Sequence, residues 1–176
     1  MPRFLGPIIL ILVVISCNNQ KSEKDVGTEN AASLVILGTV QDGGSPHIGC
    51  KKDCCKKLFE NPDPTRKVVS LGLIDFENKQ TWLMEATPDI TSQLKALKKA
   101  SKFQETETPN GIFITHAHIG HYAGLIYLGK EALGAKEVPV YAMPRMKSYL
   151  ETNGPWSQLV SQKNILLNPL KKEVCC

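Results

Sequence analysis

Three of the four histidines in the chain, His116, His118 and His121, fall within six residues. They follow the apolar run 112–114, which has the composition of a buried strand. Side chains two residues apart in extended backbone point to the same side, so the first two imidazoles can reach one point. Neutral imidazole is the commonest metal ligand among side chains. A chance surface cluster is the alternative, and the spacing favours a metal site.

Cysteines form a second group of candidate ligands. Cys50, Cys54 and Cys55 lie close together between lysines, which favour the thiolate form. This pattern predicts a small structural zinc site, with His47 or a distant residue as fourth ligand. Disulfides are the alternative, because an exported protein permits them. We favour zinc and keep the disulfide open.

The elements that must position these residues are strands and helices, which alternate poorly before the histidines and well after them. We expect a strand at 34–37 covered on both faces, a hairpin of strands 68–76 and 81–84, a helix from Thr87 to about Ala100, the strand 112–114, a helix ended by Gly134, and a strand at 138–142. This mixture predicts the α/β class.

Two connections could also contribute to a site. The glycine-rich stretch 38–46 lacks the phosphate-binding patterns, so we expect a tight turn that lets backbone pass close to a neighbouring site. Glu85 ends the second strand of the hairpin. It either orients a metal ligand or is simply solvated, and the sequence gives both equal weight.

Length and composition exclude some function classes. The chain has 176 residues, enough for one domain with a core. Its net charge of +4 is spread over lysine pairs, and only 6% of its residues are aromatic. No aromatic residues interleave with basic ones, as a nucleic-acid platform requires. We therefore expect no nucleic-acid partner.

The N-terminus has the pattern of an export signal. The apolar run 4–15 makes about 18 Å of helix, too short for a bilayer core of roughly 30 Å. Residues 1–16 therefore predict a signal peptide. The residues before Cys17 resemble the bacterial lipobox, which implies that Cys17 carries a lipid anchor; an uncleaved membrane-leaning helix is the alternative. Residues 17–31 predict a flexible tether, and the chain is expected to be a bacterial membrane-anchored lipoprotein outside the cytoplasm.

The C-terminal end leads to a further expectation. The chain stops soon after the apolar run 165–167, which has the pattern of another strand. Finished domains more often end with a docked element or a polar tail. We therefore expect residues 32–176 to be a partial domain from a truncated or frame-shifted chain.

The stretch from Thr115 to His121 resembles the His-x-His-x-Asp-His signature of the metallo-β-lactamase-fold hydrolases. The glycine loop, the cysteine cluster and residues 117–122 are similar to the branch that contains pyrroloquinoline quinone biosynthesis protein B. That branch also includes phosphodiesterases of phosphonate metabolism with a cysteine-bound structural zinc. The resemblance implies a four-layer αββα sandwich, of which residues 32–170 would be the N-terminal half.

The resemblance also implies a site. In these enzymes the first two histidines bind one zinc and the Asp-His pair serves a second, while further ligands come from the later half. Here Gly120 stands where the aspartate is expected, so one or two zinc ions are implied and the second lacks a ligand.

Three functions remain open on this basis. The first is a membrane-tethered zinc hydrolase acting on a small-molecule ester, amide or phosphodiester. The second is a non-catalytic metal-binding lipoprotein. The third is an inactive fragment, in which an apolar sheet face stays uncovered.

Overall fold

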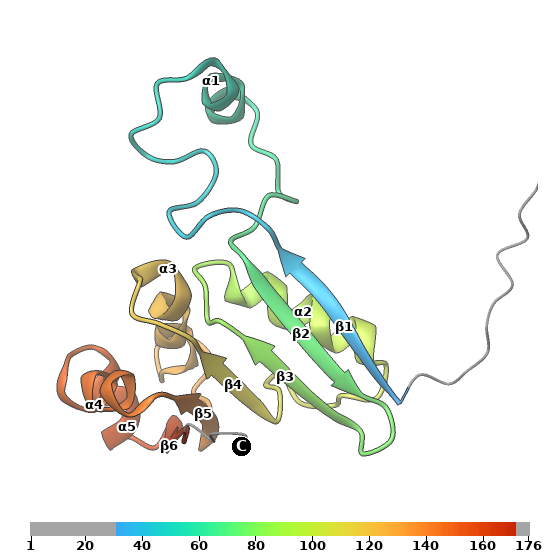
Figure 1. Ribbon diagram of the computed structural model, residues 1–176, viewed down its shortest axis with the longest axis vertical. Helices are drawn as coiled ribbons and strands as arrows, with labels where there is room; N and C mark the ends of the chain where they lie inside the picture. The colour runs from blue at the N-terminus through green and yellow to red at the C-terminus, as the bar shows by residue number, and fades with distance from the viewer. Residues whose placement is uncertain (1–30, 172–176) are drawn as a thin grey trace, which may run out of the picture.

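The computed structural model describes residues 31–171, which form one six-stranded sheet in the order of the sequence. Neighbouring strands are antiparallel from the first to the third strand and parallel from the third to the sixth (Figure 1). The strands are β1 Ala32–Gly38, β2 Ser70–Asp75, β3 Gln80–Met84, β4 Gly111–Ile114, β5 Val138–Ala142 and β6 Ile165–Pro169. The predicted α/β class is therefore confirmed.

Helices occupy the connections between the strands. They are α1 Asp53–Glu60, α2 Ile90–Ser101, α3 Ile119–Tyr122, the 3-10 helix η1 Ala123–Leu128, α4 Pro144–Thr152 and α5 Trp156–Ser161. Within residues 31–171 no helix has the length and apolar character needed to cross a membrane. The predicted signal peptide, the lipidation site Cys17 and nearly all of the predicted tether lie outside the described residues.

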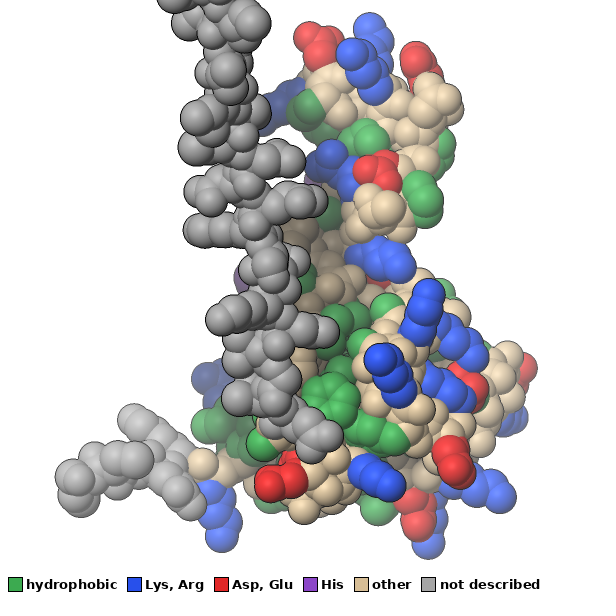
Figure 2. Space-filling view, turned by 90° about the vertical axis from the view of Figure 1, so that its right-hand side faces the viewer, with side chains coloured by type: hydrophobic (Ala, Val, Ile, Leu, Met, Phe, Trp, Pro, Cys, Tyr) green, Lys and Arg blue, Asp and Glu red, His purple; other side chains and the backbone are tan. Residues whose placement is uncertain are grey.

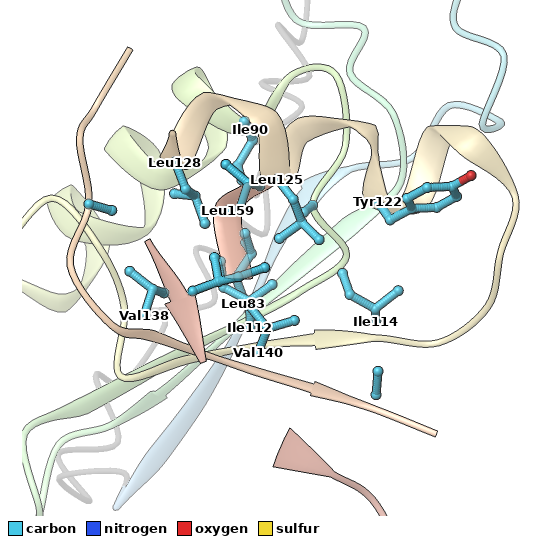
Figure 3. Packing of buried hydrophobic residues seen from close by; sticks show 14 of the residues in the cluster. Leu83, Ile90, Ile112, Ile114, Tyr122, Leu125, Leu128, Val138, Val140 and Leu159 are labelled. Atoms are coloured by element: carbon cyan, nitrogen blue, oxygen red, sulfur yellow. The ribbon is translucent and has the colours of Figure 1, made fainter. Parts of the chain in front are cut away.

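The hydrophobic core lies between one face of the sheet and the helices. Alternate strand residues such as Leu83, Ile112 and Val140 are fully buried there, and Leu125 and Leu128 of η1 pack onto them (Figure 3). Each buried aliphatic side chain of this size contributes roughly 1.5–3 kcal/mol relative to exposure. The core therefore fixes β4, the strand that leads into the histidines.

The second face of the sheet is apolar and is not covered by any described element. Leu34 is 59% and Ile36 is 68% exposed, so the expectation that strand 34–37 is covered on both faces is wrong for this structure. All helices that contact the sheet pack on the opposite face. Leu34 pairs across the strands with Leu73, and Leu73 with Trp82, so the apolar row continues over the neighbouring strands, where Leu73 and Trp82 are half-buried.

Two predicted helices have different boundaries in the structure. The helix expected from Thr87 begins at Ile90, because the Thr87 hydroxyl accepts a hydrogen bond from the Asp89 amide and donates one to Gln93. This arrangement makes a separate turn of residues 87–89. The helix expected to run to Gly134 ends at Leu128, since η1 tightens into a 3-10 helix that is capped at Gly129.

Charged side chains do not gather into one region on the face shown in Figure 2, where basic and acidic groups are interspersed. Residues 39–69 leave the sheet between β1 and β2, and Figure 1 shows α1 standing away from the strands. We call residues 39–69 the excursion.

The strand directions bring several connections to one edge. β1, β3 and β4 run the same way, because two antiparallel steps separate β1 from β3 and β4 is parallel to β3. Their carboxyl ends therefore meet at the same edge of the sheet. In open α/β sheets this edge is where ligand sites form.

Candidate metal centre at the carboxyl edge of the sheet

Glu85 follows β3 directly and is buried, with 6% of its surface exposed. Its φ of 73° lies in the left-handed region, which costs an ordinary side chain on the order of 1–3 kcal/mol. Its backbone N–H donates to the Phe113 carbonyl over 2.8 Å. The fold thus holds a carboxylate in a strained position against β4.

Thr115 connects this carboxylate to the first histidine. Its hydroxyl is hydrogen-bonded to the Glu85 carboxylate and lies 2.8 Å from His116 Nδ1. Its backbone N–H also points at Glu85, at 3.5 Å. A contact at Nδ1 fixes the imidazole ring and leaves Nε2 to face a ligand.

His121 lies on α3 and is held by backbone contacts on both sides. Its N–H donates to the His118 carbonyl over 2.9 Å, and its own carbonyl accepts from the Ala86 N–H over 2.8 Å. The next residue, Tyr122, is buried, and its carbonyl accepts a hydrogen bond from the Trp156 indole over 3.3 Å. Burial, together with the Tyr149 hydroxyl, raises the pKa of Tyr122 to about 12. α3 is therefore anchored in the core.

The His121 imidazole carries an unsatisfied buried atom. Its side chain is 11% exposed, and Nδ1 has no hydrogen-bond partner among the described residues. The nearest carboxylate atom, Glu85 Oε2, is 3.5 Å away. A buried polar nitrogen without a partner is costly, and a bound cation between the two groups would satisfy both.

Glu85, His116 and His121 together form a group that we call the donor triad. One ligand atom from each lies within 4.8 Å of the others. Atoms this close together can be ligands of one ion, and zinc binds imidazole and carboxylate at about 2.0–2.2 Å. The residues present therefore fit a metal ion, with two nitrogens and one oxygen as donors.

His118 lies next to the donor triad and faces another partner. Its ring centroid is 4.5 Å from that of His116 and 6.4 Å from that of His121. Its Nδ1 is 3.3 Å from Oδ2 of Asp42, a residue of the loop after β1. The structure thus brings the three predicted histidines to one edge, while His118 turns toward the excursion.

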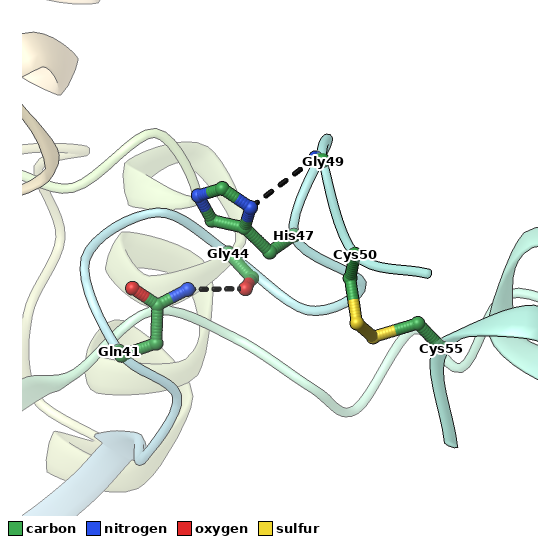
Figure 4. Close-up of a disulfide and its surroundings, with 6 residues drawn as sticks. All are labelled: Gln41, Gly44, His47, Gly49, Cys50 and Cys55. Atoms are coloured by element: carbon green, nitrogen blue, oxygen red, sulfur yellow. Dashed lines mark hydrogen bonds between the residues drawn. A yellow bond between two sulfur atoms is a disulfide. The ribbon is translucent and has the colours of Figure 1, made fainter. Parts of the chain in front are cut away.

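The predicted cysteine site lies in the excursion. The sulfurs of Cys50, Cys54 and Cys55 are within 4.8 Å of one another. Cys50 and Cys55 are joined by a disulfide (Figure 4), the alternative that the sequence left open, and Cys54 is exposed and free. His47 is exposed, and its Nδ1 accepts a hydrogen bond from the Gly49 N–H over 3.2 Å.

Sequence reasoning left Glu85 undecided and did not select Asp42. Both residues follow strands whose carboxyl ends lie at the edge of the sheet where His116, His118 and His121 lie. We call this edge the histidine edge. A search for carboxylates within a few residues after such strands could have found them. The tight turn expected in the glycine loop is present, with Gly44 in the left-handed region.

The sheet, its single helical layer and the donors at its carboxyl edge define an α/β domain with a candidate metal site. Residues 80–174, more than half of the chain, match the model of the β-lactamase superfamily domain. The chain therefore belongs to this superfamily, in its metallo-β-lactamase branch. No curated protein matches the chain significantly.

The solved structures that share this fold include two that we describe. One is Zn²⁺-bound PqqB from Methylobacterium extorquens, with a TM-score of 0.61 and 20% identity over 78% of this chain. The other is a diphosphatase from the PhnP family, with a TM-score of 0.56 and 24% identity over 81% of this chain. The chain spans about half the length of each, 49% and 51%.

Proposed function

We propose that the chain forms the metal-binding part of a zinc-dependent hydrolase acting on a small-molecule ester, amide or phosphodiester. The observation that carries this proposal is the unpartnered Nδ1 of His121 beside the Glu85 carboxylate. Family membership and the zinc-bound structural neighbour support it.

Each residue of the site has a distinct task in this proposal. His116 and His121 hold the zinc through their imidazole nitrogens, and Glu85 adds a negatively charged oxygen. The Thr115 hydroxyl orients the His116 ring and the Glu85 carboxylate by contacting both. Zinc in such a site supplies Lewis-acid polarisation and lowers the pKa of bound water to about 7.

Chelator-sensitive hydrolysis tests the proposal. Purified full chain is assayed on chromogenic ester, β-lactam and phosphodiester substrates, with and without a chelator, and again after zinc is restored. We expect turnover of at least one substrate class that chelation abolishes and zinc restores. Turnover that persists in the chelated protein would contradict the zinc assignment.

A second candidate function is metal binding without catalysis. Position 120 carries glycine where the signature has a carboxylate, which favours this alternative. It predicts stoichiometric zinc binding by calorimetry with no turnover of any of the three substrate classes. A hydrolase is distinguished from it by turnover that rises in proportion to the bound zinc.

We also propose that the protein is exported and anchored by lipid at Cys17. The basic, apolar and small-residue pattern of residues 1–17 supports this. In a bacterial host, radiolabelled fatty acid should enter the wild-type protein and be absent from Cys17→Ser. Equal labelling of both proteins would contradict the proposal.

A further inference from the structure

The position that lacks the signature carboxylate is packed against another carboxylate residue. Gly120 is buried, and a Cβ added there would lie 2.1 Å from the backbone oxygen of Asp42 and 2.7 Å from its Cβ. A Cβ atom essentially never lies this close to an atom to which it is not bonded. Glycine at 120 is therefore what allows the loop after β1 to approach α3.

The turn that presents Asp42 is held by its own hydrogen bonds. The Gln41 side-chain amide donates to the Gly44 carbonyl over 2.7 Å (Figure 4). Its side-chain oxygen accepts from the Gly43 N–H over 2.8 Å. The Gly44 N–H closes the turn on the Gln41 carbonyl over 3.0 Å. Gly44 has a φ of 85°, which suits glycine. Asp42 is thus placed by a closed turn.

Asp42 and His118 form an ion-pair contact whose spacing would also suit two ligands of one ion. Asp42 Oδ2 and His118 Nδ1 are 3.3 Å apart, longer than the ~2.7–2.9 Å of a charge-assisted hydrogen bond. Two ligands bound tetrahedrally at about 2.0–2.1 Å are separated by roughly 3.3 Å. The His118 side chain is 70% exposed and that of Asp42 is 34% exposed, so water can complete a coordination shell.

We propose that Asp42 supplies the carboxylate that position 120 lacks, and that Asp42 and His118 hold a second divalent cation beside the one in the donor triad. The inference rests on the proposed function, because it presumes an ion in the donor triad. Two ions held by these residues would supply the charge stabilisation of attacking and leaving oxygens that two-metal sites provide. Glycine at 120 is then part of the site, since it seats the loop that brings the replacement carboxylate.

Zinc titration of the full chain tests this inference without an activity assay. Metal-free wild type, Asp42→Asn and His118→Ala are titrated by calorimetry, and bound zinc is counted by elemental analysis. Wild type should bind one equivalent tightly and a second more weakly. Both variants should lose the second equivalent and keep the first.

Gly120→Ala provides an independent variant, because it removes no donor atom. The added methyl group displaces Asp42, so the second equivalent should again be lost. Gly49→Ala is the matched control, since a Cβ there meets no atom closer than 3.8 Å, and it should bind zinc like wild type.

The outcomes separate the two proposals. If Asp42→Asn keeps two equivalents, or if wild type binds only one equivalent that Asp42→Asn does not alter, the inference is wrong and the proposed function stands. A second equivalent that is retained by Asp42→Asn with 10–100-fold weaker affinity would make Asp42 a positioning residue for His118 instead of a ligand. That result would also overturn the inference. A wild type that binds no zinc would overturn both proposals.

Discussion

The histidine edge and the cysteine cluster of Cys50, Cys54 and Cys55 both bring metal-binding side chains together, but they are supported differently. The donor triad stands on the ends of β3 and β4 and on α3, next to fully buried core residues. The cysteine cluster lies in the excursion, and of its three cysteines only Cys55 is buried. A preorganised metal site therefore needs donors fixed by a packed core, whereas the cysteines depend on their own cross-link.

The largest expected effect comes from the core beneath the histidines. Ile114 ends β4 and is 1% exposed, so Ile114→Ala should lower the free energy of unfolding by about 2–5 kcal/mol. Ile48 in the excursion is 92% exposed, and Ile48→Ala should change it by less than about 0.5 kcal/mol. Urea denaturation measures the free energy of unfolding of both variants. An equal decrease in both would contradict the difference between the core and the excursion.

Thr115 tests whether the donor triad depends on preorganisation. Thr115→Val keeps the shape of the side chain and removes the hydroxyl that contacts Glu85 and His116. We expect zinc affinity to fall about 10–100-fold, as for other residues that orient metal ligands. Thr65→Val removes a comparable hydroxyl contact, to Asp63 in the excursion, and should leave zinc affinity unchanged. Calorimetry measures the zinc affinity of both variants. An affinity of Thr115→Val equal to that of wild type would show that the hydroxyl contacts are dispensable.

The cysteine cluster should respond to reductant and leave the histidine edge unaffected. Trypsin can cut after Lys51 and Lys52, so a Cys50–Cys55 disulfide predicts two peptides linked before reduction and separate after it. Reduction should leave the zinc content of the donor triad unchanged. Mass spectrometry that finds both cysteines alkylated without reductant would instead favour thiolates, and with them the structural zinc predicted from the sequence.

The smallest effect concerns the loop that leads into β4. The ion pairs with Lys95 and Lys98 lower the pKa of the Glu107 carboxyl to about 2. Because this pKa is below the ordinary value, the ion pairs stabilise the fold above about pH 4.5, and that contribution is lost as the pH falls toward 2. Carboxyl NMR should give a midpoint near 2, and Lys95→Met should raise it. A midpoint that does not move in the variant would exclude the ion pair as the cause.

Local sequence patterns predicted the elements that carry the site. The apolar run at 112–114 predicted β4 correctly, because a strand depends on a period of a few residues. The histidine spacing favoured His116 and His118 as the pair that reaches one point, whereas the structure groups His116 with His121 and Glu85. The same reasoning could not decide on Glu85. Its burial depends on β4 and α3, which follow it by about thirty residues in the chain.

Long-range contacts explain what the sequence could not predict. The approach of Asp42 to Gly120 joins segments far apart in the chain, so the sequence alone presented Gly120 as the loss of a ligand. The packing of the helix expected after His121 also depends on a distant segment. A Cβ at Gly124 would meet the Thr87 carbonyl oxygen at 2.0 Å, so η1 is shaped by the turn after β3.

The central claim is that the donor triad binds zinc. Elemental analysis of wild type, His121→Ala and His47→Ala tests it most directly, since His47 is a histidine in the exposed excursion. We predict that His121→Ala loses the tightly bound zinc and that His47→Ala retains it. Equal zinc content in wild type and His121→Ala would show that the donor triad does not hold the zinc.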